Sequence, residues 1–210
     1  MYVFPFDHPH GGARRRLASL LGAKGAALAE MTSVLGLPVP PGFTITTDAG
    51  RVVAGVGWPD GLDDEIAEHV ARLEAVVGRR LGDPDAPLLV SVRSGAHRSM
   101  PGMMDTVLDV GLGDRSLQAM AANIGDERFA WDCYRRLIDG FSRVVLGLDV
   151  GAELGPADVD VDGLRAGCER ALAVVAARSG EPFPQDPSRQ LRRAIAAVFS
   201  SWRTPRAAAY

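Results

Sequence analysis

The stretch Leu88–Asp114, LLVSVRSGAHRSMPGMMDTVLDVGLGD, decides how this chain is interpreted. Its apolar start predicts a strand over 88–92, and Arg93 stands where that strand ends. A loop of small residues, 99–104, then leads into a second apolar run. Glycine lets a backbone come close to a ligand, and a guanidinium grips phosphate through two parallel hydrogen bonds. The stretch therefore predicts a site for an anionic, phosphorylated ligand.

A second interpretation of Arg93 stays open, in which it pairs with a carboxylate such as Asp105 at the end of the strand. Gly102 allows close backbone approach to a ligand, and Thr106 offers a hydroxyl for a hydrogen bond. The methionines within 100–104 fit either the surroundings of an adenine ring or an ordinary apolar core. The prediction of a site rests on the combination of these residues.

The segment Gly22-Ala23-Lys24-Gly25 is the other candidate loop. A helical pattern begins directly after Lys24, and the free N–H groups and dipole of a helix start favour an anion. Lys24 would add a point charge for phosphate oxygens. The spacing is not that of a Walker A loop, and a flexible helix start with a solvated lysine is the competing interpretation.

The sequence predicts no catalytic residue in this segment, because no nucleophile with a neighbouring base and no pair of carboxylates stands out. His8 and His10 form an H-x-H pair, but further metal ligands do not follow nearby, so no metal site is expected. Cys133 and Cys168 lie far apart within helical patterns and are predicted to be buried free thiols.

The bulk composition excludes several classes of partner. Apolar residues make up 47% of the 210 residues, enough for a proper core, and the formal charge of −3 argues against nucleic acid. No apolar run approaches the ~20 residues that cross a bilayer, and no secretory signal is visible. Free thiols suit a reducing compartment, so we expect a cytoplasmic protein without a membrane partner.

Hydrophobic periodicity divides the chain into an α/β part and an all-helical part. It predicts strands over 43–47 and 88–92, with Asp48 as a cap after the first, and an amphipathic helix over 63–81 stopped by Gly82. Further helices are predicted over 116–124, 126–147, 160–178 and 187–202. The expected fold is α/β (α+β), with a first mixed lobe over 1–112 and a helical subdomain over 113–210. The few strands and the abrupt end at 202–210 predict that part of the fold lies outside this segment.

Four stretches, in this order, closely resemble the pyruvate, phosphate dikinase family. They are LLGAKGAALAEMTSVLGLPVPPGFTITTDA (20–49), VSVRSGAHRSMPGMMDTVLDVGLGD (90–114), GDERFAWDCYRRLIDGFSRVVLG (125–147) and AVFSSWRTPRAAAY (197–210). The resemblance implies the amino-terminal part of an ATP-grasp nucleotide-binding domain, whose first mixed lobe is followed by a helical subdomain. It runs over essentially the whole chain.

The resemblance also implies roles for particular residues. The family's ATP-contacting lysine matches Lys24, its phosphate-gripping arginine matches Arg93, and a glycine and a threonine that contact ATP match Gly102 and Thr106. The ligands of Mg²⁺ and the phosphoryl-carrying histidine are expected outside this segment. Ala23 stands where the family usually has glycine, which disturbs the loop only if that position needs a positive φ.

The function implied is ATP binding for an enzyme that converts ATP, phosphate and pyruvate into AMP, pyrophosphate and phosphoenolpyruvate. The segment alone is expected to be inactive, with the other domains of the same enzyme as its partners and a homodimer as the expected full-length assembly. A phosphoenolpyruvate synthase, an antibiotic phosphotransferase relative and a non-catalytic interaction module are the alternatives.

Overall fold

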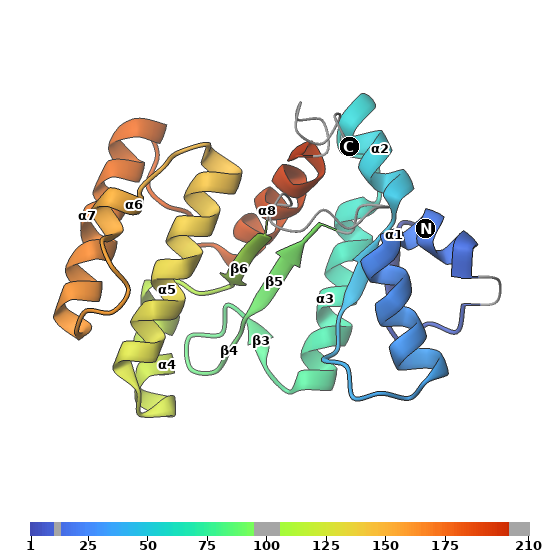
Figure 1. Cartoon of the computed structure of the whole chain (residues 1–210), viewed down its shortest axis with the longest axis horizontal. Coiled ribbons are helices and arrows are strands. Elements are labelled where there is room, and N and C mark those ends of the chain that lie inside the picture. The colour runs from blue at the N-terminus through green and yellow to red at the C-terminus, as the bar shows by residue number, and fades with distance from the viewer. Residues whose placement is uncertain (11–13, 95–105, 202–210) are drawn as a thin grey trace. The chain divides into compact units, whose positions relative to one another are not determined.

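The computed structural model describes residues 1–10, 14–94 and 106–201, and these fall into two compact units (Figure 1). Met1–Gly78 forms most of the first unit, and Arg79–Arg93 with Asp105–Val198 forms the second. Each unit is described separately below. The mixture of helices and short two-stranded sheets confirms the predicted α/β (α+β) class.

The first unit pairs two short strands and covers them with helices. β1 (Val3–Pro5) runs antiparallel to β2 (Phe43–Ile45), with Val3 opposite Ile45 and Pro5 opposite Phe43. The helices are α1 (Arg14–Ala29), which continues as one π-helical turn, η1 (Glu30–Val34), followed by α2 (Thr47–Gly55) and α3 (Leu62–Val77).

Glu65 ties β1 to α3. Its Oε2 accepts hydrogen bonds from the backbone N–H groups of Tyr2, at 2.6 Å, and Val3, at 2.9 Å. Because one carboxylate satisfies two backbone donors of an edge strand, a charged side chain replaces the ladder partner that β1 lacks on that side.

The helix predicted over 63–81 ends earlier than expected. α3 stops at Val77, and Gly78 caps it with φ 71°, donating its N–H to the carbonyl of Glu74. Arg80–Leu81 instead forms β3, which pairs in parallel with β4 (Pro87–Leu88). The prediction of Gly82 as the stop is wrong because Gly78 reaches the left-handed conformation first and ends the helix there.

The cap predicted at Asp48 is also wrong. Thr46 is the residue with extended backbone before α2, and its hydroxyl accepts from the N–H of Ala49 at 3.3 Å. Asp48 lies inside the first turn and forms an ion pair with Arg51. The strand before it is correspondingly shorter than predicted, since it ends at Ile45.

The second unit holds the short parallel pair β3–β4, one antiparallel strand pair and a set of helices. β5 (Val90–Arg93) pairs with β6 (Thr106–Val110), and every described element after β6 is a helix. These are α4 (Asp114–Ile124), α5 (Glu127–Phe141), the π-helical turn η2 (Ser142–Leu146), α6 (Gly151–Leu154), α7 (Val161–Ser179) and α8 (Pro187–Ser201). The four predicted helices are confirmed, whereas a functional boundary at 112 stays a prediction.

Aromatic residues and two thiols fill the helical core. Phe183 contacts the rings of Tyr134 and Phe141 edge-on, and the Tyr134 hydroxyl donates to Asp114 Oδ1 at 2.6 Å. Cys133 and Cys168 are buried and free, as predicted. Burial raises the pKa of both thiols, to about 12 for Cys168.

Gln190 is a fully buried polar side chain of α8 with every bonding group used. Its Nε2 donates to the carbonyls of Leu112, at 3.0 Å, and Pro184, at 2.7 Å, and its Oε1 accepts from the N–H of Gly111 at 2.9 Å. The side chain thereby holds the turn that follows β6 against α8.

Replacing Gln190 with leucine should destabilise the chain by about 2–4 kcal/mol, because buried backbone groups at 111, 112 and 184 lose their partner. Urea denaturation measures the loss. The matched control is Gln118→Leu on the exposed face of α4, where no change beyond about 0.5 kcal/mol is expected. Equal effects of the two substitutions would contradict the role given to Gln190.

Candidate functional site

Arg93 and Thr106 lie directly opposite each other in the β5–β6 pair, where β5 ends and β6 begins. In an antiparallel ladder, opposite residues point to the same face with Cβ atoms about 5 Å apart. The guanidinium of Arg93 and the hydroxyl of Thr106 therefore start from neighbouring positions on one face. This register brings together two of the four residues that the sequence predicts for the site.

The burial along the two strands separates a structural part from an accessible end. Val107 and Val110 of β6 are fully buried, whereas Arg93 is exposed and Thr106 is half-buried. Among the residues that the structure describes, Arg93 forms no ion pair. Asp105, the carboxylate that competes for Arg93 in the sequence analysis, lies outside the described residues.

β6 contains a bulge that the sequence analysis missed. Val92 is opposite Val107 and Val90 is opposite Val110, so β6 has one more residue than β5 between these two pairs. Asp109 lies in the bulge with φ 57°, the one positive φ among the described residues other than glycine. Aspartate tolerates this conformation without requiring it, so the sequence carries no signal for the bulge.

The segment around Lys24 contains the helix start that the sequence predicts. Gly22 interrupts α1 with φ 74° and ψ 166°, a combination that is essentially restricted to glycine. A new helical segment begins after it, and the first N–H groups of any helix lack an intrahelical partner. Lys24 is exposed at this start, and Ala23 keeps a negative φ, so alanine there strains nothing.

Gly25 serves packing rather than ligand approach. A Cβ at this position would lie 2.8 Å from Cγ2 and 2.9 Å from Oγ1 of Thr44 in β2. The helix can approach the strand this closely only because residue 25 has no side chain. The two glycines of the loop thus have different roles: Gly22 resets the helix direction and Gly25 seats it on β2.

Two of the predicted site residues, Lys24 and Gly102, stay predictions as members of this site. Lys24 belongs to the first unit and Arg93 and Thr106 to the second, and their convergence on one ligand stays a prediction. Gly102 and the methionines of 100–104 lie outside the described residues.

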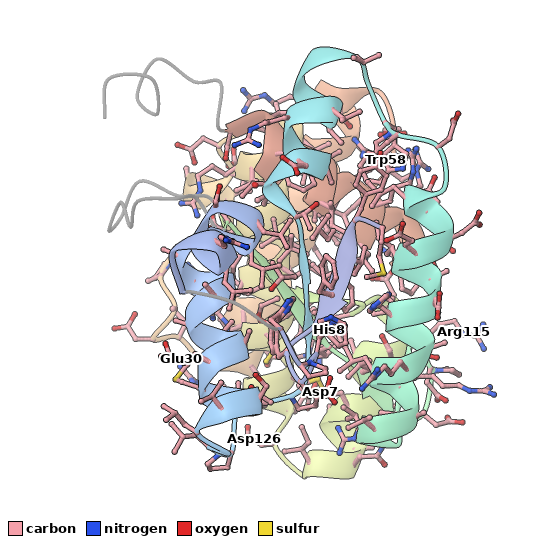
Figure 2. The ribbon with its side chains drawn as sticks, turned by 90° about the vertical axis from the view of Figure 1, so that its right-hand side faces the viewer. Asp7, His8, Glu30, Trp58, Arg115 and Asp126 are labelled. Carbon is pink, nitrogen blue, oxygen red and sulfur yellow. The ribbon has the colours of Figure 1, made fainter. Side chains whose placement is uncertain are left out.

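A shallow groove in the first unit contains none of the predicted site residues. Its walls come from the end of β1, the proline-rich segment 39–42 and α3, and include Phe43 and Leu73. At its edge Asp7 accepts from Arg72 at 2.7 Å, so the charges there already satisfy each other. Figure 2 shows Asp7 and His8 between the ribbons of α1 and α3.

The histidine pair is packed as an aromatic group. The rings of His8 and His10 lie 4.5 Å apart, and each contacts the ring of Phe4 at 5.2 Å. Burial and the neighbouring His8 lower the pKa of His10. Across the described part of the chain, no three histidine, cysteine or acidic side chains come close enough together to hold a metal ion.

Comparisons with known proteins define first the class and then the family. The sequence profile described as "Pyruvate phosphate dikinase, AMP/ATP-binding domain" matches residues 18–55 and 51–210. The chain is 45% identical over 227 aligned positions to a pyruvate, phosphate dikinase of Rhizobium meliloti (strain 1021), covering 100% of this chain and 25% of that protein.

Two further relatives come from distant organisms. A chloroplastic pyruvate, phosphate dikinase 1 of Oryza sativa subsp. japonica is 44% identical over 99% of this chain and 23% of its own length. A pyruvate, phosphate dikinase of Giardia intestinalis is 45% identical over 91% of this chain and 23% of its own length.

This chain therefore belongs to the pyruvate phosphate dikinase AMP/ATP-binding domain family. It spans about a quarter of the length of the curated relatives it matches. The family agrees with the partial ATP-grasp fold that the sequence predicts. Among the described helices, none combines the length and the apolar character that a membrane span requires.

Replacing Gly22 with alanine should cost about 1–3 kcal/mol of unfolding free energy, because a side chain must either accept the glycine-only conformation or force α1 to continue straight. Urea denaturation followed by circular dichroism measures it. The control is Gly55→Ala at the end of α2, where an added Cβ meets nothing within 4 Å and is not placed at positive φ. A control as damaging as Gly22→Ala would contradict a special role for the kink.

Proposed function

We propose that this chain is the ATP-binding segment of a pyruvate, phosphate dikinase, and that Arg93 and Thr106 contact the phosphates of the nucleotide. The observation that carries the proposal is their opposite placement at the exposed end of β5 and β6, in a chain that matches the AMP/ATP-binding domain. An arginine fork and a hydroxyl supply the charge-assisted and neutral hydrogen bonds that phosphate oxygens accept.

Lys24 and Gly102 complete the proposed site. Lys24 stands exposed at a helix start, where backbone N–H groups and the helix dipole add to its charge. Gly102 would let the loop backbone approach the nucleotide. In this proposal residues 1–112 provide the nucleotide-binding lobe, and the helices of 113–210 form a subdomain that supports it.

The whole enzyme's reaction belongs to the proposal as well. The relatives are named pyruvate, phosphate dikinases, which implies conversion of ATP, phosphate and pyruvate into AMP, pyrophosphate and phosphoenolpyruvate. In this proposal the ligands of Mg²⁺, the carrier histidine and the pyruvate site belong to other domains of the enzyme. The proposed location is the cytoplasm and the proposed assembly is a homodimer.

Substitution of the two cations tests the nucleotide site directly. Arg93→Ala should weaken ATP binding at least tenfold, because a charged hydrogen bond to phosphate contributes ~1.5–3 kcal/mol, and Lys24→Ala should weaken it by a similar factor. Titration calorimetry of the chain with ATP measures both. Wild-type affinity itself should be weak, since an ATP-grasp nucleotide sits between two lobes.

Arg115→Ala is the matched control. Arg115 is an exposed arginine of α4, labelled in Figure 2, and its removal changes the net charge by the same amount without touching the proposed site. Equal losses in all three variants would indicate a general charge effect. A wild-type chain that takes up no ATP would instead favour the interaction module.

The chain alone should form no phosphoenolpyruvate from ATP, phosphate and pyruvate, because phosphoryl transfer needs a carrier histidine and a pyruvate site that are assigned to other domains. A coupled assay for phosphoenolpyruvate measures this, with a full-length pyruvate, phosphate dikinase as the positive control. Turnover by a clean preparation would overturn the assignment of catalysis to those domains.

A further inference from the structure

Besides the apolar contacts between α5 and β6, two contacts concern the bulge and the start of the strand. Arg136 donates from Nε to Asp109 Oδ2 at 3.3 Å, at the bulge. One helical turn further on, a Cβ added at Gly140 would lie 3.5 Å from the carbonyl oxygen of Thr106 and 3.8 Å from Cα of Val107. The first contact is polar and the second brings helix backbone against strand backbone.

Arg136 is itself fixed by its own helix. Its Nη1 lies 3.1 Å from Asp132 Oδ2, and its Nη2 donates to Cys133 Sγ at 3.0 Å. Because two of its three guanidinium contacts are made within α5, Arg136 has little freedom to follow Asp109 if that residue moves. Arg136 is therefore the fixed partner of the pair, and it holds Asp109 and the bulge against α5.

The bulge determines which residue of β6 stands opposite Arg93. Between Val110 and Val107 the strand uses one residue more than its partner, and Asp109 with φ 57° absorbs it. Loss of this extra residue from the bulge would slip the strand by one position, and a slip of one position turns every side chain to the other face. Thr106 would then no longer share a face with Arg93.

We infer that Arg136 and Gly140 are positioning residues of the nucleotide site: through the Asp109 bulge and the close approach to Thr106 they set the register that places Thr106 opposite Arg93. The part of this inference that concerns ATP rests on the proposed function. The register itself is a property of the β5–β6 pair alone. Burial raises the pKa of Asp109 in spite of Arg136, which fits a pair that contributes more to position than to stability.

A cross-strand disulfide reports the register without any nucleotide. Arg93→Cys with Thr106→Cys places two thiols at opposite positions, within the Cα separation that a disulfide spans. With oxidised glutathione as the oxidant, this pair should close readily, and the buried Cys133 and Cys168 should not compete. Adding Arg136→Met should slow closure at least fivefold at a temperature where circular dichroism shows the chain folded.

A rescue substitution separates positioning from general stability. In the Arg136→Met background, Asp109→Gly should restore closure, because glycine adopts φ 57° without a stabilising partner. Arg136→Lys keeps the charge but not the forked guanidinium, so its rate of disulfide closure should lie between that of the chain with Arg136 and that of Arg136→Met. Closure unaffected by Arg136→Met, or left slow by the added glycine, would overturn the inference.

Gly140 provides a second, independent variant. Its Cβ contacts would be of ordinary length, so Gly140→Ala should leave disulfide closure unchanged, whereas the branched side chain of Gly140→Val reaches Thr106 and should slow closure at least fivefold. Similar closure rates for the two variants would contradict the role of Gly140.

ATP binding is measured separately, in chains that keep the natural Arg93 and Thr106. Arg136→Met should weaken ATP binding about five- to tenfold, and Asp109→Gly in the same chain should recover it. If wild-type chain binds no ATP, the proposed function fails while the disulfide still decides the register. If wild type binds ATP and Arg136→Met binds equally well, the inference fails and the proposed function stands.

Discussion

The contact of α5 with β6 is the constraint on which the second unit depends. Leu137 and Phe141 of the helix and Val107 and Val110 of the strand are all fully buried. Burial of this apolar surface stabilises the unit, at about 25 cal/mol per Å² removed from water. The same burial leaves the polar end of the strand pair at the surface, because only the inner face of β6 is needed for the core. β6 thus contributes both buried residues to the core and, at Thr106, a residue to the accessible end of the strand pair.

Helices with a strong apolar period were predictable from sequence, and their ends were less so. The period of 3.6 residues identified α5 and α7 within a few residues, because one face of each must be buried. Gly78 and Gly82 could each end α3, and the choice depends on the pairing of Arg80 with Pro87. That pairing joins two strands of only two residues each, which are too short to show a periodic pattern in the sequence.

The candidate site was predictable as a set of residue types and not as a geometry. Arg93 stood out because a charge follows an apolar strand, and Gly22 marked a helix start. The placement of Arg93 opposite Thr106 depends on the bulge at Asp109. An aspartate within a strand does not by itself predict a left-handed backbone conformation. Arg136 has the pattern of an ordinary surface residue of a helix, so its contact with the bulge is visible only in three dimensions.

The two thiols have a consequence for how the chain meets oxidants. Cys133 is 2% and Cys168 is 0% exposed, and burial raises the pKa of both thiols, which disfavours the thiolate that peroxide attacks. Oxidation of either sulfur therefore requires the helical core to open first. The rate at which mild peroxide oxidises the two thiols then reports how often that core opens. The two cysteines therefore serve as an internal probe of local unfolding in the helical core.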